Sequence, residues 1–136
     1  MHTNNDIKTF LYKYIKEQSL YSEIKNKGGE LYKNQRPTNS TVDDCVVSVH
    51  TMLNGDYGKA IVYVNIYVQD IKRNNEYVED TITTALFEQE ITKAFDNFKC
   101  CTDIYRVRLD SILIFKINGR NEHCVNAELS INIVNY

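Results

Sequence analysis

Two runs rich in β-branched residues, separated by Asn54-Gly55, constrain the fold of this chain more than any other feature. Asn-Gly favours a tight hairpin turn because both residues tolerate positive φ angles. The run after the turn alternates, so its valines lie on one face of a strand and Ile61, Tyr63 and Tyr67 lie on the other. The two runs are therefore predicted to form an antiparallel hairpin with one aliphatic face and one aromatic and polar face.

A second pair of alternating runs surrounds Asn118-Gly119 and predicts a second hairpin. One face of its first strand is expected to carry Tyr105, Val107, Leu109, Leu113, Phe115 and Ile117. The other face is expected to carry Arg106, Arg108, Asp110 and Lys116. On the returning strand, the residues expected to face the core are Val125, Ala127, Leu129, Ile131 and Ile133.

Apolar residues at helical spacing predict two amphipathic helices, over 3–18 and 81–98. Thr3 and Asp80 are suited to cap their N-termini. Residues 19–27 are expected to extend or cap the first helix, and Gly28-Gly29 ends it. The expected core stripe of the second helix is Phe87, Ile91, Ala94, Phe95 and Phe98, widened by Ile82 and Leu86. A short strand at 30–33 and polar loops at 34–41 and 72–79 complete the pattern.

These elements predict a single α+β domain over residues 1–136. Its antiparallel β-sheet is built from two hairpins, and the two amphipathic helices pack on one face of that sheet. A chain of 136 residues with 43% hydrophobic residues can bury a sizeable core.

Composition and charge argue against several classes of function. The net charge is −2 with scattered basic residues, which disfavours broad binding to a nucleic-acid backbone. No apolar run approaches the roughly 20 residues of a membrane span. The N-terminus lacks the basic and apolar regions of a signal peptide, so we expect a cytosolic product whose four cysteines are free thiols.

The best candidate metal ligands are Cys100-Cys101 together with His123-Cys124. Zinc sites usually combine four such ligands in spaced pairs, and neither Cys-x-x-Cys nor a helical His pair is present. We therefore interpret these cysteines as small apolar residues of the core. The expectation is that the chain holds no metal and no cofactor.

The candidate catalytic groups have equally plain structural interpretations. Asp43-Asp44 and Glu79-Asp80 each precede a predicted element, where acidic residues end loops or cap helices. His50 lies within a strand without a nucleophile in register. Gly28-Gly29 lacks the Lys-Ser or Lys-Thr of a phosphate loop. We expect no catalytic residues and no enzymatic activity.

The aromatic strand face is the most informative candidate site. Ile61, Tyr63 and Tyr67 lie opposite the face that the helices should cover, and tyrosine supplies large contact area with a polar tip. The expectation is a surface for a partner protein, and the alternative is that residues 20–35 or 70–80 fold over it. Arg106 and Arg108 share one strand face, which we interpret as solvated or intersubunit, with phosphate binding as the alternative.

Several stretches together carry a resemblance to a known family. They are Glu30-Leu31-Tyr32, Arg36-Pro37-Thr38-Asn39-Ser40, Asp43-Asp44-Cys45-Val46-Val47-Ser48-Val49 and Val62-Tyr63-Val64-Asn65-Ile66-Tyr67-Val68. In this order, after a short first helix, they resemble the tail terminator (tail-completion) proteins of long-tailed bacteriophages and prophages.

The resemblance implies a homo-oligomeric ring, usually hexameric, that caps the tail tube, ends its polymerisation and joins it to the head connector. Its implied partners are other copies of the chain and the tail-tube and head-connector proteins, without membrane or sequence-specific nucleic-acid binding. The implied location is the host bacterial cytoplasm during assembly and then the virion tail. The alternatives are a head-closure (neck) protein of the same gene module and a small non-viral α+β protein that binds a ligand between sheet and helices.

Overall fold

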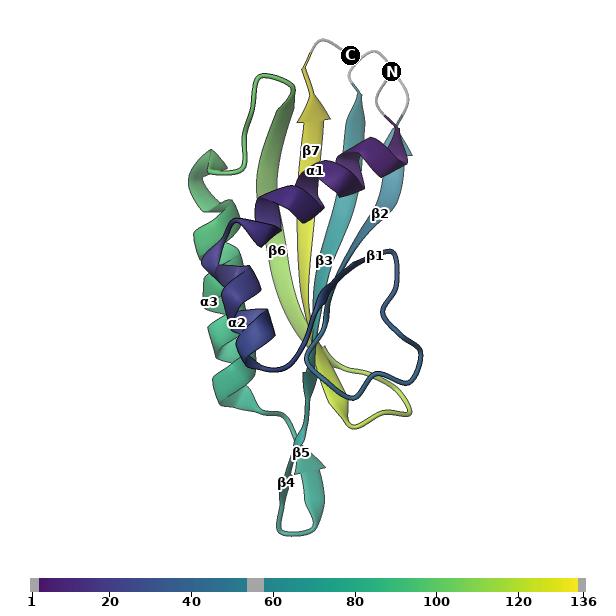
Figure 1. Cartoon of the computed structure of the whole chain (residues 1–136), viewed down its shortest axis with the longest axis vertical. Coiled ribbons are helices and arrows are strands. Elements are labelled where there is room, and N and C mark those ends of the chain that lie inside the picture. The colour runs from purple at the N-terminus through teal and green to yellow at the C-terminus, as the bar shows by residue number, and fades with distance from the viewer. Residues whose placement is uncertain (1–2, 54–57, 135–136) are drawn as a thin grey trace.

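The computed structural model describes residues 3–53 and 58–134, which form a helix-covered β-sheet (Figure 1). The helices are α1 (Asn4–Lys16), α2 (Ser19–Asn26) and α3 (Thr81–Phe95), followed by the short 3-10 helix η1 (Asp96–Phe98). The main sheet contains, in spatial order, β1 (Leu31–Lys33), β2 (Cys45–Leu53), β3 (Lys59–Gln69), β7 (Glu122–Ile133) and β6 (Tyr105–Lys116). A separate hairpin contains β4 (Ile71–Arg73) and β5 (Glu76–Val78). The predicted α+β class is confirmed.

Both predicted hairpins are present in the sheet. β2 pairs antiparallel with β3, β3 with β7, and β7 with β6. The Asn54-Gly55 turn itself lies outside the described residues. At the second turn Gly119 has φ +77°, a conformation that glycine adopts readily. One pairing departs from the purely antiparallel prediction, because β1 runs parallel to β2.

The core lies between one sheet face and the three helices. In Figure 1, α1 crosses the strands while α2 and α3 lie side by side, and α2 and α3 are in contact. From the sheet, fully buried residues include Val62, Val64, Ile66, Val68, Val125, Ala127, Leu129 and Ile131. From the helices they include Ile7, Leu11, Ile15, Leu20, Ile24, Phe87, Ile91 and Phe95. The alternation predicted for β3 and β7 is therefore confirmed.

Local signals explain where the first two helices begin and end. Thr3 and Asp6 form a capping box at the start of α1, as each side chain accepts the other residue's backbone N–H. α2 ends in a Schellman motif, in which Gly28 (φ +83°) donates to the Lys25 carbonyl and Gly29 to the Ile24 carbonyl. Residues 3–27 thus form two separate helices. The sequence predicted a single helix over 3–18 that residues 19–27 would extend or cap.

Two predictions for the third helix and the following segment need correction. Asp80 caps α3 as expected, through its contact with the Thr83 N–H at 3.1 Å. The helix ends at Phe95, however, and the exposed Phe98 has φ +58°, so it lies outside the core stripe. Ile82 is also exposed. The stripe is narrower than predicted because Thr83 and Thr84 occupy buried positions in the first turn.

The predicted loop 72–79 is instead the β4–β5 hairpin. Asn74 and Asn75 both have positive φ angles, of 52° and 65°, and form its turn. Asparagine tolerates this conformation better than other non-glycine residues. The hairpin extends beyond the end of the main sheet (Figure 1).

The largest correction concerns β6. Its pairing with β7 is continuous up to Leu109 and then skips one residue, so that Ser111 lies opposite Glu128. This β-bulge at Asp110 reverses the orientation of every following side chain. Leu113 and Phe115, predicted to face the core, are 59% and 44% exposed on the opposite face.

Candidate assembly surface

The sheet face opposite the helices, called here the open face, contains the sequence-predicted site residues. Ile61, Tyr63 and Tyr67 are half-buried and alternate along β3 with fully buried valines. Arg106 and Arg108 reach the same face, because their partners on β7 are Asn132 and Ser130 and the partner of Ser130 on β3 is Ile61. The structure thus places all five predicted interface residues on one face of the sheet.

One half of the open face is built around Tyr63. The ring of Tyr63 packs against His50 of β2, with centroids 4.9 Å apart. His50 is the extra residue where the β2–β3 register shifts, and it is exposed. Beside Tyr63, Asn65 accepts a hydrogen bond from Asn126 of β7 at 2.6 Å. This half presents an aromatic pair next to a neutral polar ladder.

The open face also includes two residues of β6 that the sequence analysis assigned to the core. Leu113 and Phe115 of β6 lie opposite Asn126 and Cys124 of β7, whose other neighbours are Asn65 and Tyr67 of β3. The sequence signal for this bulge is the unbroken apolar run Ile112–Phe115, because it interrupts strict alternation directly after two polar residues. The open face is therefore more apolar than predicted.

The other half of the open face, around Tyr67, is covered by the chain itself. The guanidinium of Arg36 lies 3.7 Å from the centroid of the Tyr67 ring. Arg36 belongs to residues 34–44, called here the covering segment, which connects β1 to β2. It borders a pocket of about 310 Å³ that Tyr67, Val46 and Arg120 also line. Part of the face is thus covered, and the residue over Tyr67 is Arg36, just beyond the 20–35 stretch and outside the 70–80 stretch that were the predicted alternatives.

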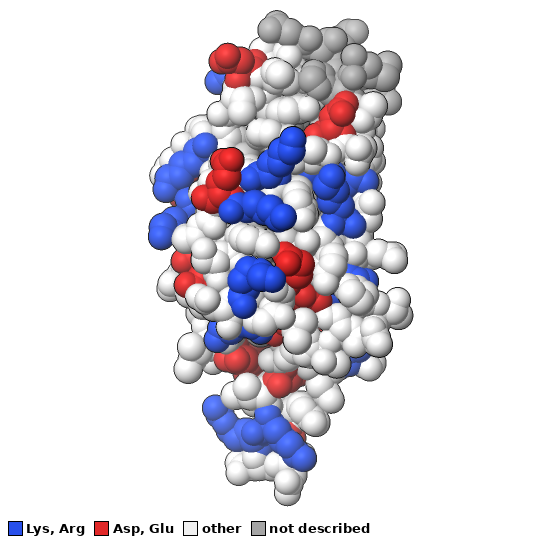
Figure 2. All heavy atoms as spheres, viewed as in Figure 1, with Lys and Arg blue, Asp and Glu red and all other residues white. Residues whose placement is uncertain are grey.

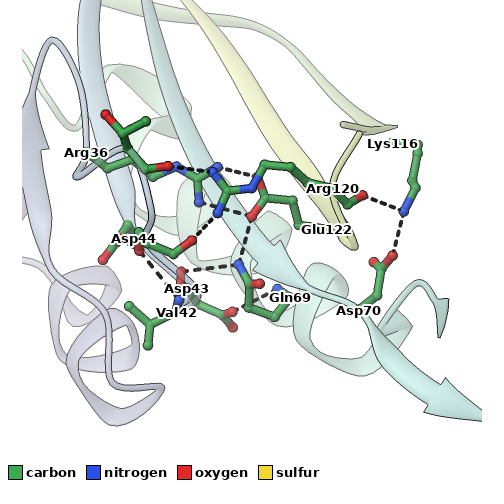
Figure 3. A network of polar contacts seen from close by, with 11 residues as sticks. Arg36, Val42, Asp43, Asp44, Gln69, Asp70, Lys116, Arg120 and Glu122 are labelled. Atoms are coloured by element: carbon green, nitrogen blue, oxygen red, sulfur yellow. Dashed lines mark hydrogen bonds and ion pairs between the residues drawn. The ribbon is translucent and has the colours of Figure 1, made fainter. Parts of the chain in front are cut away.

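A buried carboxylate anchors the covering segment (Figure 3). Glu122, at the start of β7, has no exposed surface and accepts hydrogen bonds from Arg36 Nη1 at 3.1 Å and Gln69 Nε2 at 2.8 Å. Arg120 Nε lies 3.3 Å from the same carboxylate. Burial alone would raise the pKa of Glu122, but these hydrogen bonds and the two arginine charges hold it below its usual value.

The paired carboxylates fix the same segment. Asp44 is buried and accepts the backbone N–H of Glu30 at 2.9 Å and the hydroxyl of Ser40. Asp43 accepts the backbone N–H of Gln69 at 2.9 Å, and burial raises its pKa to about 6. Their interpretation as loop-ending residues agrees with these contacts.

The second carboxylate pair serves the start of α3. Asp80 caps the helix, and Glu79 accepts the Thr84 hydroxyl at 2.7 Å. Nearby, His123 Nδ1 lies 2.7 Å from Asp70 Oδ1, and the other oxygen of Asp70 accepts from Lys116 Nζ at 2.9 Å. These contacts join the end of β3 to the β6–β7 turn.

The two pairs considered as metal ligands, Cys100-Cys101 and His123-Cys124, are not brought together. Cys101 contacts the backbone of Val107 near the start of β6, whereas Cys124 pairs with Phe115 near its end. Burial raises the pKa of Cys124 to about 12, which disfavours the thiolate form that metals bind. Among the described residues no group of three or more His, Cys, Asp or Glu side chains is arranged to hold a metal ion.

Charge on the helix-covered face is mixed. Figure 2 shows basic and acidic side chains interspersed over the helices, with basic groups also at the end where Figure 1 places the β4–β5 hairpin. The exposed Lys72 and Arg73 belong to that hairpin. In the described part of the chain, no helix is long and apolar enough to cross a membrane.

Comparison with known proteins gives a similarity in structure. No family model matches the sequence, and no curated protein matches it. The structure is similar to a chain in the virion of a native gene transfer agent (GTA) particle, with a TM-score of 0.57 over 93% of both chains. The two sequences are 8% identical over this match. The similarity therefore establishes that this chain shares its α+β fold with a chain of that virion.

Proposed function

We propose that this chain is a structural component of a phage-type particle. More specifically, we propose that it acts as a tail terminator: copies of the chain form a ring, hexameric in the family it resembles, that caps the tail tube and ends its polymerisation. The ring then joins the tube to the head connector. The fold shared with a chain of the GTA virion over 93% of both chains supports the particle role, and the sequence resemblance supports the specific position.

The observation that carries the proposal is the uncovered half of the open face. His50 is exposed beside Tyr63, and Leu113 and Phe115 present apolar surface on the same side of the sheet. Aromatic and apolar residues grouped on one face are typical of protein–protein contact surfaces. A neighbouring subunit or a tail-tube subunit would remove this surface from water.

The polar clusters support a structural role in preference to catalysis. Glu122, Asp43 and Asp44 are each engaged in holding the covering segment. Among the described residues, every buried side-chain nitrogen and oxygen has a hydrogen-bond partner. A hydrolytic site would require a nucleophile oriented by a base, and these buried groups are already committed to loop anchoring.

Tyr63→Asp tests the proposal, because it places a charge in the uncovered half of the face. We expect the variant to keep its circular dichroism spectrum and melting temperature, and to lose ring formation in light scattering at high concentration. We also expect it to lose capping of tubes grown from the particle's tail-tube protein. Ile82→Asp is the matched control, since Ile82 is 83% exposed on α3 and away from this face.

Two results would contradict the proposal. Unfolding of the Tyr63 variant would show that this residue belongs to the core. A folded Tyr63 variant that assembles and caps tubes as well as the control would show that the open face has no assembly role.

A further inference from the structure

The first half of β6 is an edge that the chain itself protects. Thr102 donates its backbone N–H to the Tyr105 carbonyl at 2.9 Å, and its hydroxyl accepts the Tyr105 N–H at 2.9 Å. Cys101 Sγ lies 3.5 Å from the Val107 nitrogen and 3.7 Å from its carbonyl oxygen. The outward backbone groups at two successive edge positions are thereby occupied.

The second half of β6, after the bulge, has no such cover in the described structure. The Ile117 N–H donates a hydrogen bond to the Glu122 carbonyl at 3.0 Å, which shows which residues of β6 direct their backbone groups toward β7. Since bonding alternates along an antiparallel strand, Ile112, Ile114 and Lys116 direct their N–H and C=O groups away from β7. No described strand lies beyond β6 in the sheet.

This uncovered edge is apolar as well as unpaired. Ile112 to Phe115 form an unbroken apolar run, and the last three are exposed. Monomeric proteins usually block such edges with charges, prolines or covering loops, because an exposed edge recruits another strand. In β6 the covering contacts do not extend beyond the bulge, so the backbone groups of the remaining segment can pair with an added strand.

The opposite edge of the sheet has a segment of similar length. β1 pairs only with Cys45–Val47, which leaves Ser48–Leu53 of β2 without an outer partner among the described residues. Three antiparallel pairings separate β2 from β6, so these two edge strands run in opposite directions. The two segments are displaced along the strands, because Ile112 shares its row of the sheet with Val47, whereas Ser48 shares its row with Ser111. Rotation about an axis tilted relative to the strands, as strands are tilted in a closed barrel, would bring β6 of one copy antiparallel to this part of β2 of the next.

We infer that the Ile112–Lys116 edge of one subunit pairs with the Ser48–Leu53 edge of a second copy, so that the sheet continues between subunits. The contact is heterologous, with different surfaces from each copy, and a heterologous contact closes into a ring when its rotation permits. This inference rests on the proposed ring and assigns its subunit interface. The side chains of Leu113 and Phe115 would then pack against the neighbouring strand.

Ile114→Pro tests the pairing. Proline removes the outward N–H of Ile114 and is tolerated at an edge position whose N–H makes no internal bond. We expect the folded variant to need at least about tenfold higher concentration to assemble, as measured by analytical ultracentrifugation. Ile114→Val, which keeps the backbone donor, is the matched control and should assemble as wild type.

Mixing distinguishes this contact from a symmetric β6–β6 contact. Tagged Ile114→Pro subunits keep a normal β2 edge, so they should be recovered together with untagged wild-type subunits and shorten their assemblies. They should not associate with one another. Failure to bind wild type would overturn the β6–β2 pairing.

A second variant covers the possibility that the proline variant fails to fold. Leu113→Lys places a charge on the same edge without removing a backbone donor. It should weaken assembly at least about tenfold, whereas Ile82→Lys, on α3, should leave assembly unchanged. Wild-type assembly by folded edge variants, or a wild-type chain that stays monomeric at all concentrations, would overturn the inference. If the edge variants or a monomeric wild-type chain still cap tail tubes, the proposed function is not contradicted.

Discussion

Replacing Glu122 by alanine tests how the covering segment is held over Tyr67. The Glu122 side chain is fully buried, and its partner Arg36 is only 10% exposed, whereas Arg120 is 32% exposed. Without the carboxylate, Arg120 can turn to water but Arg36 becomes a buried, unpaired charge. Removing one partner of a buried ion pair usually costs about 3–5 kcal/mol of folding free energy.

Release of the covering segment would limit this cost. If residues 34–44 lift away, Arg36 regains its hydration, and the remaining loss equals the free energy with which the segment docks. We therefore expect Glu122→Ala to lose about 3 kcal/mol, at the lower end of the range, in denaturant unfolding. Hydrogen exchange across residues 34–44 should rise at the same time, while exchange in β3 stays slow.

A double-mutant cycle with Arg36→Ala isolates the interaction itself. The coupling energy between the two substitutions should lie at about 1–3 kcal/mol, and exposed Glu76→Ala, the control, should show none with Arg36→Ala. Because the pKa of Glu122 is lowered in the folded state, its stabilisation is present above the unfolded pKa. It is lost as the pH falls through the folded value. A coupling energy below about 0.5 kcal/mol would refute this account.

Two pairs of substitutions and one single substitution test the fold further. Phe95→Ala should cost about 3–5 kcal/mol because Phe95 is fully buried, whereas the exposed Phe98→Ala should change the unfolding free energy by less than about 0.5 kcal/mol. Gly29→Ala should cost more than about 2 kcal/mol in thermal unfolding, since a Cβ there would overlap the Asp43 carbonyl. Gly28→Ala should cost less, about 1 kcal/mol, because its Cβ meets open space and only the φ of +83° strains the alanine. Asp43→Asn should remove a stability loss that wild type shows as the pH rises from about 4 to 6, because burial raises the folded pKa of Asp43 to about 6. Equal losses of stability for the two phenylalanine variants, or for the two glycine variants, would contradict the burial and contacts assigned to these residues. An unchanged pH profile for Asp43→Asn would contradict the raised pKa of Asp43.

The strands that were predicted correctly are those whose surroundings match a simple local pattern. β3 has a strand on each side, helices on one face and the open face on the other, so every second residue is buried. β7 has the same surroundings, and its residues on the core face are buried from Val125 to Ile133, although Cys124 and Ser130 on the open face are buried as well. In such central strands, period-two hydrophobicity reports directly on which face is the core.

β6 shows why the same reasoning fails at an edge. A single extra residue at Asp110 moves Leu113 and Phe115 from one face of the sheet to the other. Strand propensity and hydrophobic alternation do not indicate where such an extra residue lies. α3 shows a related limit, because the extended backbone of Asp96 and the positive φ of Asn97 end the helix before Phe98, although the apolar spacing continues to Phe98. Both errors come from extending a period beyond the residue that breaks it.

The anchor of the covering segment was not predictable from local patterns for a different reason. Arg36 and Glu122 are 86 positions apart, and each belongs to a short polar stretch that reads as loop. Their pairing depends on β7 lying next to β3, with Gln69 between them, and so on the completed sheet. Sequence alone indicated that 34–41 is a loop, but not that it folds over Tyr67.

This anchor divides the residues that the sequence grouped as one surface. Tyr67 packs against Arg36 of its own chain, so a carboxylate introduced at Tyr67 would compete with Glu122 for that guanidinium and disturb the covering segment. Loss of assembly in such a variant would therefore not identify a partner contact. Tyr63 instead stacks on the exposed His50, and no contact joins it to the covering segment among the interactions described. Tyr63 is thus the position at which a substitution reports on assembly separately from folding.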